Sequence, residues 1–230
     1  MKKKIIALVL ARKGSLRLKN KNNLKLHNKP LIQWTFDKLK EKKIRKLFTN
    51  VLISTDSFKI KNISQQYKFL APWLRPKKLC TKSSTSESAA LHALNWYENN
   101  IEKIDGLFLF QPTSPFRDSK KIILAIKTFL KTNKQVVSVS SKKLFKFNKN
   151  SINGSMYLTP INILKKHKTF SERGFVPLKM TTEIENIDID TQEDFDRAKK
   201  LLKNIKNKFY NSNCLKKICF GKVNSDKKFL

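Results

Sequence analysis

The chain contains 230 residues, of which 50 are Lys or Arg and 17 are Asp or Glu, so its formal net charge is +33. A chain of this length can bury the core of one domain. Such a charge by itself suggests binding to nucleic acid or to an anionic membrane. The basic residues are nevertheless spread along the whole sequence rather than gathered in one arm, which favours a solvated surface.

No apolar run approaches the length of a membrane-spanning helix, and the one near the N-terminus is too short for a signal peptide. We therefore expect a cytoplasmic protein with no membrane span and no specific nucleic-acid partner. The three cysteines have neither the spacing of a disulfide framework nor neighbouring histidines for a zinc site, so free thiols are predicted.

The first predicted strand is the unbroken apolar run from Ile5 to Leu10, which is typical of a strand buried on both faces of a parallel sheet. Ligands in such sheets bind just beyond the carboxyl ends of the strands, where the loop 11–22 follows. Gly14 permits a close backbone approach, and Arg12 and Lys21 are among the basic residues around it. The composition indicates a phosphate-binding loop, although the pattern is neither a Walker A loop nor a dinucleotide fingerprint.

The next predicted elements are a helix over 32–42, a strand over 51–54 and a helix over 58–67. Asp56 stands between the last two, and we favour a helix cap over a metal ligand as its role. A further helix over 87–98 contains His92 beside its apolar stripe. A packed or surface role is favoured over a catalytic one for this histidine.

The third predicted strand, over 106–110, ends in a loop stiffened by two prolines, a composition that suits a specificity loop. Its first residue is Gln111, whose amide can donate and accept at once and so read the edge of a base. The alternative is an ordinary strand-to-helix turn, with Asp118 or Ser119 capping a helix over 120–130.

The remaining predicted elements are strands over 135–139 and 153–158, a short helix over 161–166 and a helix over 192–202. Asp188 and Asp190 stand two residues apart in an extended run, so their carboxylates point to the same side. Two like charges side by side call for a cation, and oxygen ligands suit Mg²⁺. The competing explanation is a double helix cap with Thr191 and Asp194, which accounts better for Asp190 than for Asp188.

This alternation of strands and helices predicts an α/β fold, with a mostly parallel central sheet flanked by helices. We expect one domain over residues 1–202, followed by a basic C-terminal tail, 203–230, of unknown role.

Taken together, the motifs resemble those of the acylneuraminate cytidylyltransferases, the CMP-sialic acid synthetase family. The opening motif is Ala11-Arg12-Lys13-Gly14-Ser15 with Lys21-Asn22, where the family usually has Ala-Arg-Gly-Gly-Ser and Lys-Asn. The later motifs are, in the family's order, Ser54-Thr55-Asp56, Arg75-Pro76, Gln111-Pro112-Thr113-Ser114-Pro115, Asn153-Gly154-Ser155-Met156-Tyr157 and Asp188-Ile189-Asp190-Thr191. The resemblance implies the nucleotide-diphospho-sugar transferase fold, which is Rossmann-like.

The resemblance also implies an activity: transfer of CMP from CTP to the anomeric hydroxyl of an acidic nine-carbon sugar of the sialic-acid type, with release of pyrophosphate. Arg12 and Lys21 would be catalytic, Gln111 would read cytosine, and Asp188 with Asp190 would carry Mg²⁺. The nucleotide-binding residues would be Ala11, Arg12, Gly14, Ser15, Lys21, Asn22, Arg75, Ser83, Ser84, Gln111, Thr113 and Ser114.

Three departures from the family pattern leave alternatives open. Lys13 and Leu16 stand where the family often has glycine and lysine, an aspartate is usual near Lys82, and the segment between Val139 and Asn153 is shorter than in typical members. That segment carries part of the sugar site and of a dimer-forming extension in the family. The alternatives are therefore another acid sugar (ketodeoxyoctulosonate, legionaminate or pseudaminate) or an inactive homologue. A homodimer is expected from the resemblance, and a basic nucleic-acid-binding protein is the alternative from another class.

Overall fold

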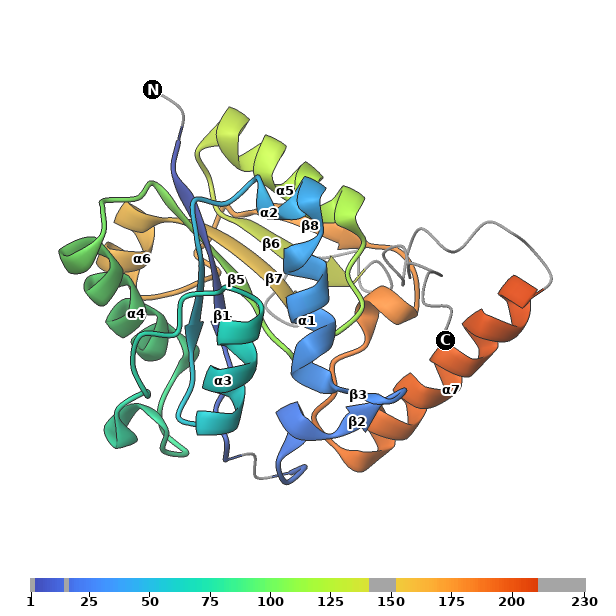
Figure 1. Ribbon diagram of the computed structural model, residues 1–230. Coiled ribbons are helices and arrows are strands. Elements are labelled where there is room, and N and C mark those ends of the chain that lie inside the picture. Colours follow the sequence, from blue (N-terminus) through green and yellow to red (C-terminus); the bar gives the residue numbers. More distant parts are fainter. Residues whose placement is uncertain (1–2, 15–16, 141–151, 211–230) are drawn as a thin grey trace, which may run out of the picture.

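The computed structural model describes residues 3–14, 17–140 and 152–210. Its central feature is a six-stranded sheet with the order β4-β1-β5-β7-β6-β8 (Figure 1). The strands are β1 (Ile5–Leu10), β4 (Val51–Ser54), β5 (Gly106–Phe110), β6 (Val136–Ser140), β7 (Ile152–Pro160) and β8 (Val176–Met180). β7 runs antiparallel to β5 and β6, while every other pairing in this sheet is parallel. The predicted mostly parallel α/β fold is thus confirmed.

Helices cover both faces of the sheet (Figure 1). One face packs against α1 (Leu31–Lys40), α2 (Lys42–Arg45), α3 (Phe58–Gln66) and α5 (Ser119–Thr132). The other face packs against α4 (Ser86–Asn100) and α6 (Ile161–His167). A third apolar cluster joins α7 (Gln192–Tyr210) to the small hairpin β2 (Lys25–Leu26) and β3 (Lys29–Pro30). Three 3₁₀ turns complete the elements: η1 (Lys21–Asn23), η2 (Lys77–Leu79) and η5 (Ile184–Asn186).

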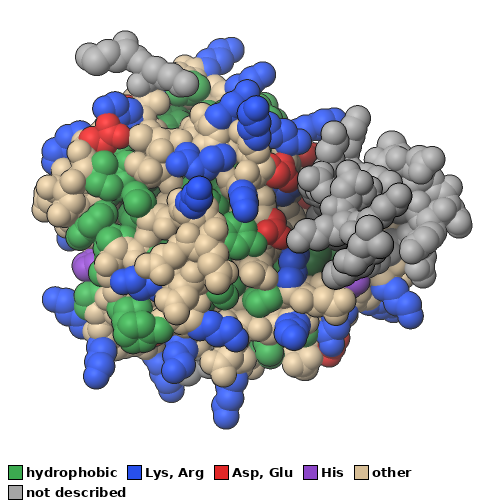
Figure 2. Space-filling model, in the orientation of Figure 1, with side chains coloured by type: hydrophobic (Ala, Val, Ile, Leu, Met, Phe, Trp, Pro, Cys, Tyr) green, Lys and Arg blue, Asp and Glu red, His purple; other side chains and the backbone are tan. Residues whose placement is uncertain are grey.

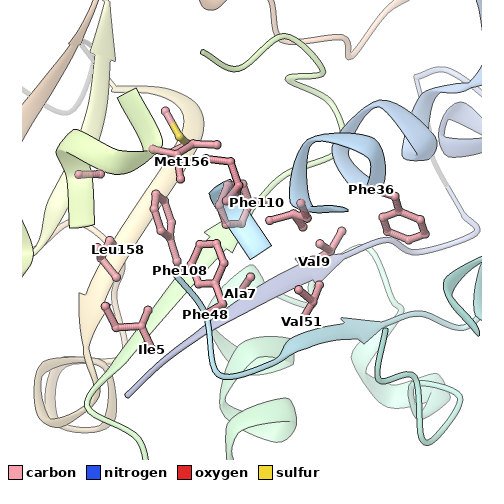
Figure 3. Close-up of a cluster of buried hydrophobic side chains, with 14 of the residues drawn as sticks. Ile5, Ala7, Val9, Phe36, Phe48, Val51, Phe108, Phe110, Met156 and Leu158 are labelled. Carbon is pink, nitrogen blue, oxygen red and sulfur yellow. The ribbon is translucent and has the colours of Figure 1, made fainter. Parts of the chain in front are cut away.

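Strand β1 shows why the sequence reads as an unbroken apolar run. Ile5, Ala7 and Val9 point into the cluster drawn in Figure 3, together with Phe108 and Phe110 of β5. The intervening residues of both strands point into the cluster under α4 and α6. Because alternate side chains of a strand face opposite sides, a strand covered on both faces must be apolar at every position.

Several predicted boundaries shift in the structure. The helix predicted over 32–42 is divided at Glu41 into α1 and α2, and α7 continues to Tyr210, across the expected boundary at residue 202. Strand β8 was not predicted, because its alternation of exposed and buried positions spans only a few residues. Asp118 caps α5, as one of the two residues proposed for that role, by accepting from the backbone N–H of Lys120 at 2.9 Å. No helix among the described ranges is long and apolar enough to cross a membrane.

Candidate active site

The carboxyl ends of β1 and β5 open onto a cleft of about 520 Å³. Nine of the predicted site residues line it: Arg12, Gly14, Lys21, Asn22, Arg75, Ser84, Gln111, Thr113 and Asp190. The lining also contains six residues that were not among the predicted ones: Leu10, Arg17, Leu79, Thr85, Ser86 and Pro112. Segments far apart in the sequence therefore meet where a parallel sheet typically binds its ligand.

The loop after β1 is held in place by contacts at both its ends. The N–H of Ala11 donates to the carbonyl of Ser54 at 3.0 Å. Arg12 accepts at its carbonyl from the Asn22 side chain at 3.0 Å and donates from its guanidinium to the carbonyl of Thr81 at 2.9 Å. Gly14 lies in open space, with no atom within 4 Å of where a Cβ would stand. Ser15 lies outside the described residues.

Asp56 belongs to this support rather than to a helix cap. Its Oδ1 accepts from the backbone N–H of Lys13 at 2.6 Å. The cap of α3 is Ser57, whose hydroxyl accepts from the N–H of Ile60 at 3.4 Å. The predicted cap was therefore wrong by one residue, because the chain reaches the capping conformation only at Ser57.

The cleft is strongly cationic on the side of the phosphate loop. Arg12, Arg17, Lys21 and Arg75 line it, and Asp190 is the carboxylate among its lining residues. Lys21 Nζ donates to Asp190 Oδ1 at 2.5 Å, and Arg17 donates to the other carboxylate oxygen. These charges suit a polyanion such as a triphosphate. Arg17 was noticed in the sequence only as part of the positive surroundings of Gly14, because a lone basic residue in a lysine-rich chain carries no further signal.

Arg75 supports the wall of the cleft opposite the phosphate loop. Its side chain is buried, and it donates from Nε to Ser54 Oγ at 2.9 Å and from Nη2 to the Ser54 carbonyl at 2.5 Å. Burial lowers the pKa of Arg75. These bonds tie the predicted nucleotide-binding arginine to the end of β4.

The N-terminus of α4 also opens at the cleft. Thr85 caps this helix by accepting from the N–H of Ser88 at 3.1 Å, and Thr85 and Ser86 both line the cleft. A helix N-terminus carries a partial positive charge that favours anions. Ser84 lines the cleft as predicted, whereas Ser83 does not, although its hydroxyl lies 3.1 Å from that of Thr81. The Thr-x-x-Ser spacing before an apolar stripe was a cap signal that could have identified Thr85.

The loop after β5 contributes Gln111 and Thr113 to the lining as predicted, but not Ser114. Ser114 is 1% exposed, and its hydroxyl has no hydrogen-bond partner among the described residues. It lies behind the cleft, so a direct contact with the nucleotide, as implied by the resemblance, is not supported by this arrangement.

Asp188 and Asp190 lie between η5 and α7 in irregular chain rather than in a strand. Asp188 Oδ1 is enclosed and without a hydrogen-bond partner in the described part of the chain. Burial raises the pKa of Asp188, and the neighbouring charge of Asp190 raises it further, against the effects of a Thr113 hydrogen bond and of Lys21. The two carboxylates therefore sense each other, as the spacing predicted.

The helix cap does not consume these carboxylates. Asp194 Oδ2 accepts from the N–H groups of Asp190 and Thr191 at 3.0 and 2.9 Å, and Thr191 Oγ1 accepts from the N–H of Asp194 at 3.2 Å. This reciprocal pair is the predicted capping box. It fixes the backbone at Asp190 and leaves the side chains of Asp188 and Asp190 to other partners.

The rest of the basic surface is spread out. Lys and Arg side chains are scattered over the visible face in Figure 2, with no single stripe of them. His92, whose role was taken to be packing, lies edge-on to the ring of Trp73 at a centroid distance of 5.4 Å. Burial lowers the pKa of His92, and the charges of Arg75 and Lys78 act in the same direction. Neither feature competes with the cleft as a site of chemistry.

Comparison with known proteins places the cleft in a class. Residues 6–218 match the family model described as Cytidylyltransferase, so the chain belongs to the cytidylyltransferase family and is a nucleotidyltransferase. It is 31% identical to the CMP-N,N'-diacetyllegionaminic acid synthase of Legionella pneumophila, over 86% of this chain and 96% of that protein. It is 34% identical to the N-acylneuraminate cytidylyltransferase of Escherichia coli over 86% of this chain, which spans about half (52%) of that relative.

Solved structures share the fold at low sequence identity. The structure titled CMP:2-keto-3-deoxy-manno-octonic acid synthetase complexed with CTP has a TM-score of 0.67 at 12% identity, covering 88% of this chain and 99% of that one. A cytidylyltransferase from Leptospira borgpetersenii has a TM-score of 0.62 at 17% identity, with coverage of 96% and 99%. The Rossmann-like nucleotidyltransferase fold expected from the motifs is thus confirmed.

Proposed function

We propose that the chain transfers CMP from CTP to the anomeric hydroxyl of a nine-carbon 2-keto sugar acid of the sialic-acid type, for the synthesis of surface glycans. The observation that carries this proposal is the cleft itself. Four cationic side chains gather at the strand ends on one side, and the pair Asp188 and Asp190 follows on the other. This arrangement fits a triphosphate and an adjoining acceptor hydroxyl.

The nucleotide would lie along the loop after β1. Arg12 and Lys21 would hold the phosphates and neutralise the charge that develops during transfer, which makes them the catalytic residues of the proposal. Asn22 donates its amide to the Arg12 carbonyl, and its enclosed Oδ1 has no partner among the described residues. That oxygen would accept from a ribose hydroxyl. Arg75 and Ser84 would enclose the nucleotide, and Gln111 would read the cytosine edge.

The donor set also fits Mg²⁺. Asp188 has an enclosed carboxylate oxygen without a partner, and the neighbouring Asp190 is the second oxygen donor. No group of three or more metal-type side chains occurs in the described ranges, so the remaining ligands would be phosphate oxygens and water. When bound, the ion would neutralise phosphate charge and polarise the acceptor hydroxyl.

The reaction itself needs alignment more than covalent participation by the protein. The anomeric oxygen forms a bond to the α-phosphorus of CTP, the bond from that phosphorus to the bridging oxygen breaks, and pyrophosphate leaves with the electron pair. The hydroxyl proton is released on formation of the CMP-sugar. The residues of the chain would hold the two reactants in line and offset the phosphate charge.

The acceptor is the open part of the substrate assignment. The Legionella relative, named for diacetyllegionaminic acid, aligns along nearly its whole length, and the Escherichia coli relative is named for N-acylneuraminate. Legionaminic acid is therefore the second candidate beside sialic acid. Action in the cytoplasm and as a homodimer belong to the same proposal.

The deciding experiment measures pyrophosphate release from CTP over a panel of N-acetylneuraminic, diacetyllegionaminic, pseudaminic and ketodeoxyoctulosonic acids. We expect turnover with at least one nine-carbon acid and the formation of the corresponding CMP-sugar by mass spectrometry. Strong turnover with the eight-carbon acid alone would replace the acceptor class. No release with any acid would refute the activity and favour an inactive homologue.

A further inference from the structure

Arg117 is a buried cation at the point where β5 and β7 part. Its side chain is 3% exposed. Burial lowers the pKa of Arg117 to about 9, and the charge of Asp188 opposes this. A buried charge costs folding free energy unless hydrogen bonds compensate for the lost water. The position of this residue therefore calls for an account of what its guanidinium holds.

The hydrogen bonds of Arg117 go to backbone carbonyls at the ends of two strands. The last residue pair of the β5 and β7 ladder is Phe110 with Met156, so Gln111 and Ser155 are the first residues beyond it. Arg117 donates from Nη2 and Nε to the Ser155 carbonyl at 3.0 and 3.2 Å, and from Nη2 to the Gln111 carbonyl. Buried carbonyls that leave a ladder need new donors, and one planar guanidinium supplies both.

Two further contacts hold the guanidinium itself in place. Nη1 donates to the hydroxyl of Thr35, a fully buried residue of α1, at 3.1 Å. The guanidinium carbon also lies over the ring of Phe110, 5.4 Å from its centroid. The clamp thus joins β5, β7 and α1 around one rigid group.

The atoms that Arg117 holds carry the polar groups of the cleft. Gln111 lines the cleft with its side chain. Gly154, which precedes Ser155, has φ +76°, and a Cβ there would lie 3.5 Å from Asp188 Oδ2 and 3.7 Å from Gln111 Oε1. The backbone fixed by the guanidinium is therefore the backbone on which the Gln111 amide and its neighbour Asp188 are set.

We infer that Arg117 is a positioning residue for nucleotidyl transfer: it holds the backbone of Gln111 against that of Ser155 and so fixes the Gln111 amide in the cleft. The kinetic part of this inference rests on the proposed function. A lysine cannot replace the arginine, because an ammonium is a point charge without the planar fork that reaches both carbonyls.

A double-mutant cycle tests the inference. Arg117→Lys should lower kcat/KM for CTP by about ten- to a hundredfold, the scale of a misplacement of about 1 Å at a reacting group. In a Gln111→Ala background the same substitution should have little further effect, because the amide that it positions is gone. Arg173→Lys, the same change at an exposed position, is the matched control. If the effects of Arg117→Lys and Gln111→Ala multiply, the inference is wrong.

A milder variant protects the test against failure to fold. Thr35→Val removes the acceptor for Arg117 Nη1 and keeps the shape of a side chain outside the cleft. It should lower kcat/KM less than Arg117→Lys does, and again only while Gln111 is present. A loss that is equal in both backgrounds would show a purely structural role and contradict the inference.

A binding measurement separates this inference from the proposed function. The rise in melting temperature on adding CTP should exceed that with UTP for the unmodified protein, and Arg117→Lys should reduce this difference. No acid sugar is needed for this readout. A lost nucleotide preference in Arg117→Lys, with no turnover of any acid sugar by the unmodified protein, would refute the activity alone. Full turnover by the unmodified protein with an unchanged preference in Arg117→Lys would refute the positioning role alone.

Discussion

The carboxylate of Asp56 accepts a hydrogen bond from the backbone N–H of Lys13 at 2.6 Å, which ties the end of β4 to the loop after β1. The N–H of Ala11 reaches the Ser54 carbonyl beside it. The phosphate loop is thus fastened to the neighbouring strand by one charged side chain and one backbone bond. Its residues Arg12 and Gly14 are held ready for a ligand before the ligand arrives.

We expect Asp56→Ala to raise the KM for CTP about tenfold, since hydrogen bonds to charged groups contribute about 1.5–3 kcal/mol. Steady-state kinetics with CTP as the varied substrate would measure it. Asp56→Asn keeps the oxygen that accepts from Lys13 and should restore most of the affinity. An Asn variant as impaired as the Ala variant would show that charge, not the hydrogen bond, is what matters.

Asp188→Asn and Asp190→Asn should each lower turnover by about a hundredfold or more, because an ion at the phosphates contributes several kcal/mol. Calorimetric titration of Mn²⁺ into protein with CTP should show weakened metal binding in both variants. Asp196→Asn, on the exposed side of α7, is the matched control. Full activity of the unmodified enzyme after treatment with a chelator would rule out the metal role.

Gln111→Ala should raise the KM for CTP and narrow the preference for CTP over UTP, because the amide would satisfy both a donor and an acceptor of cytosine. The ratio of kcat/KM values for the two nucleotides is the measurement, with Gln65→Ala as an exposed control. An unchanged nucleotide ratio, combined with a raised KM for the acid sugar, would move Gln111 to the acceptor side of the cleft.

The scattered positive charge predicts different salt dependences for two ligands. Binding to duplex DNA should collapse between about 50 and about 200 mM salt, because many released counterions drive it. The KM for CTP should rise far less, since a few short bonds in a cleft are screened less than surface charges. Sequence-selective DNA binding that persists at the upper salt, without cytidylyl transfer, would favour the nucleic-acid alternative.

Tyr157 gives a prediction for alkaline pH. Burial raises the pKa of Tyr157 to about 12, and the charges of Asp188 and Glu87 act in the same direction. The folded state therefore keeps this proton between the unfolded pKa of about 10 and the folded one, and its stability falls as pH rises through that window. In urea unfolding, Tyr157→Phe should lose less stability than the unmodified protein between about pH 10 and about pH 12. Equal losses would contradict the assigned burial.

The sequence predicted best where a single physical requirement shaped a segment. The strand Ile5–Leu10 must be apolar at every position because both faces are covered, so its pattern identified a central strand and the loop beyond it. Glycine and basic residues then marked that loop as a phosphate site. The capping box of Thr191 and Asp194 was equally local, and it was confirmed.

Long-range contacts set the limits of that approach. Nothing in the sequence shows that Arg117 reaches Ser155 or that Ser114 turns behind the cleft, because both outcomes depend on how β7 enters the sheet. Asp56 was assigned to a nearby helix, and its partner is Lys13, in a segment that only the parallel pairing of β1 with β4 brings alongside. Local propensity cannot predict such partners.

The antiparallel strand β7 also sets the order in which the sheet can be completed. β6 is synthesised before β7 but pairs only with β7 and β8 among the described strands. A nascent chain that has emerged as far as β6 therefore holds a finished β4-β1-β5 half with the β5 edge uncovered and β6 without a neighbour. Unpaired edges invite association with other chains. Translation through residue 160 is the moment at which that hazard ends for β5.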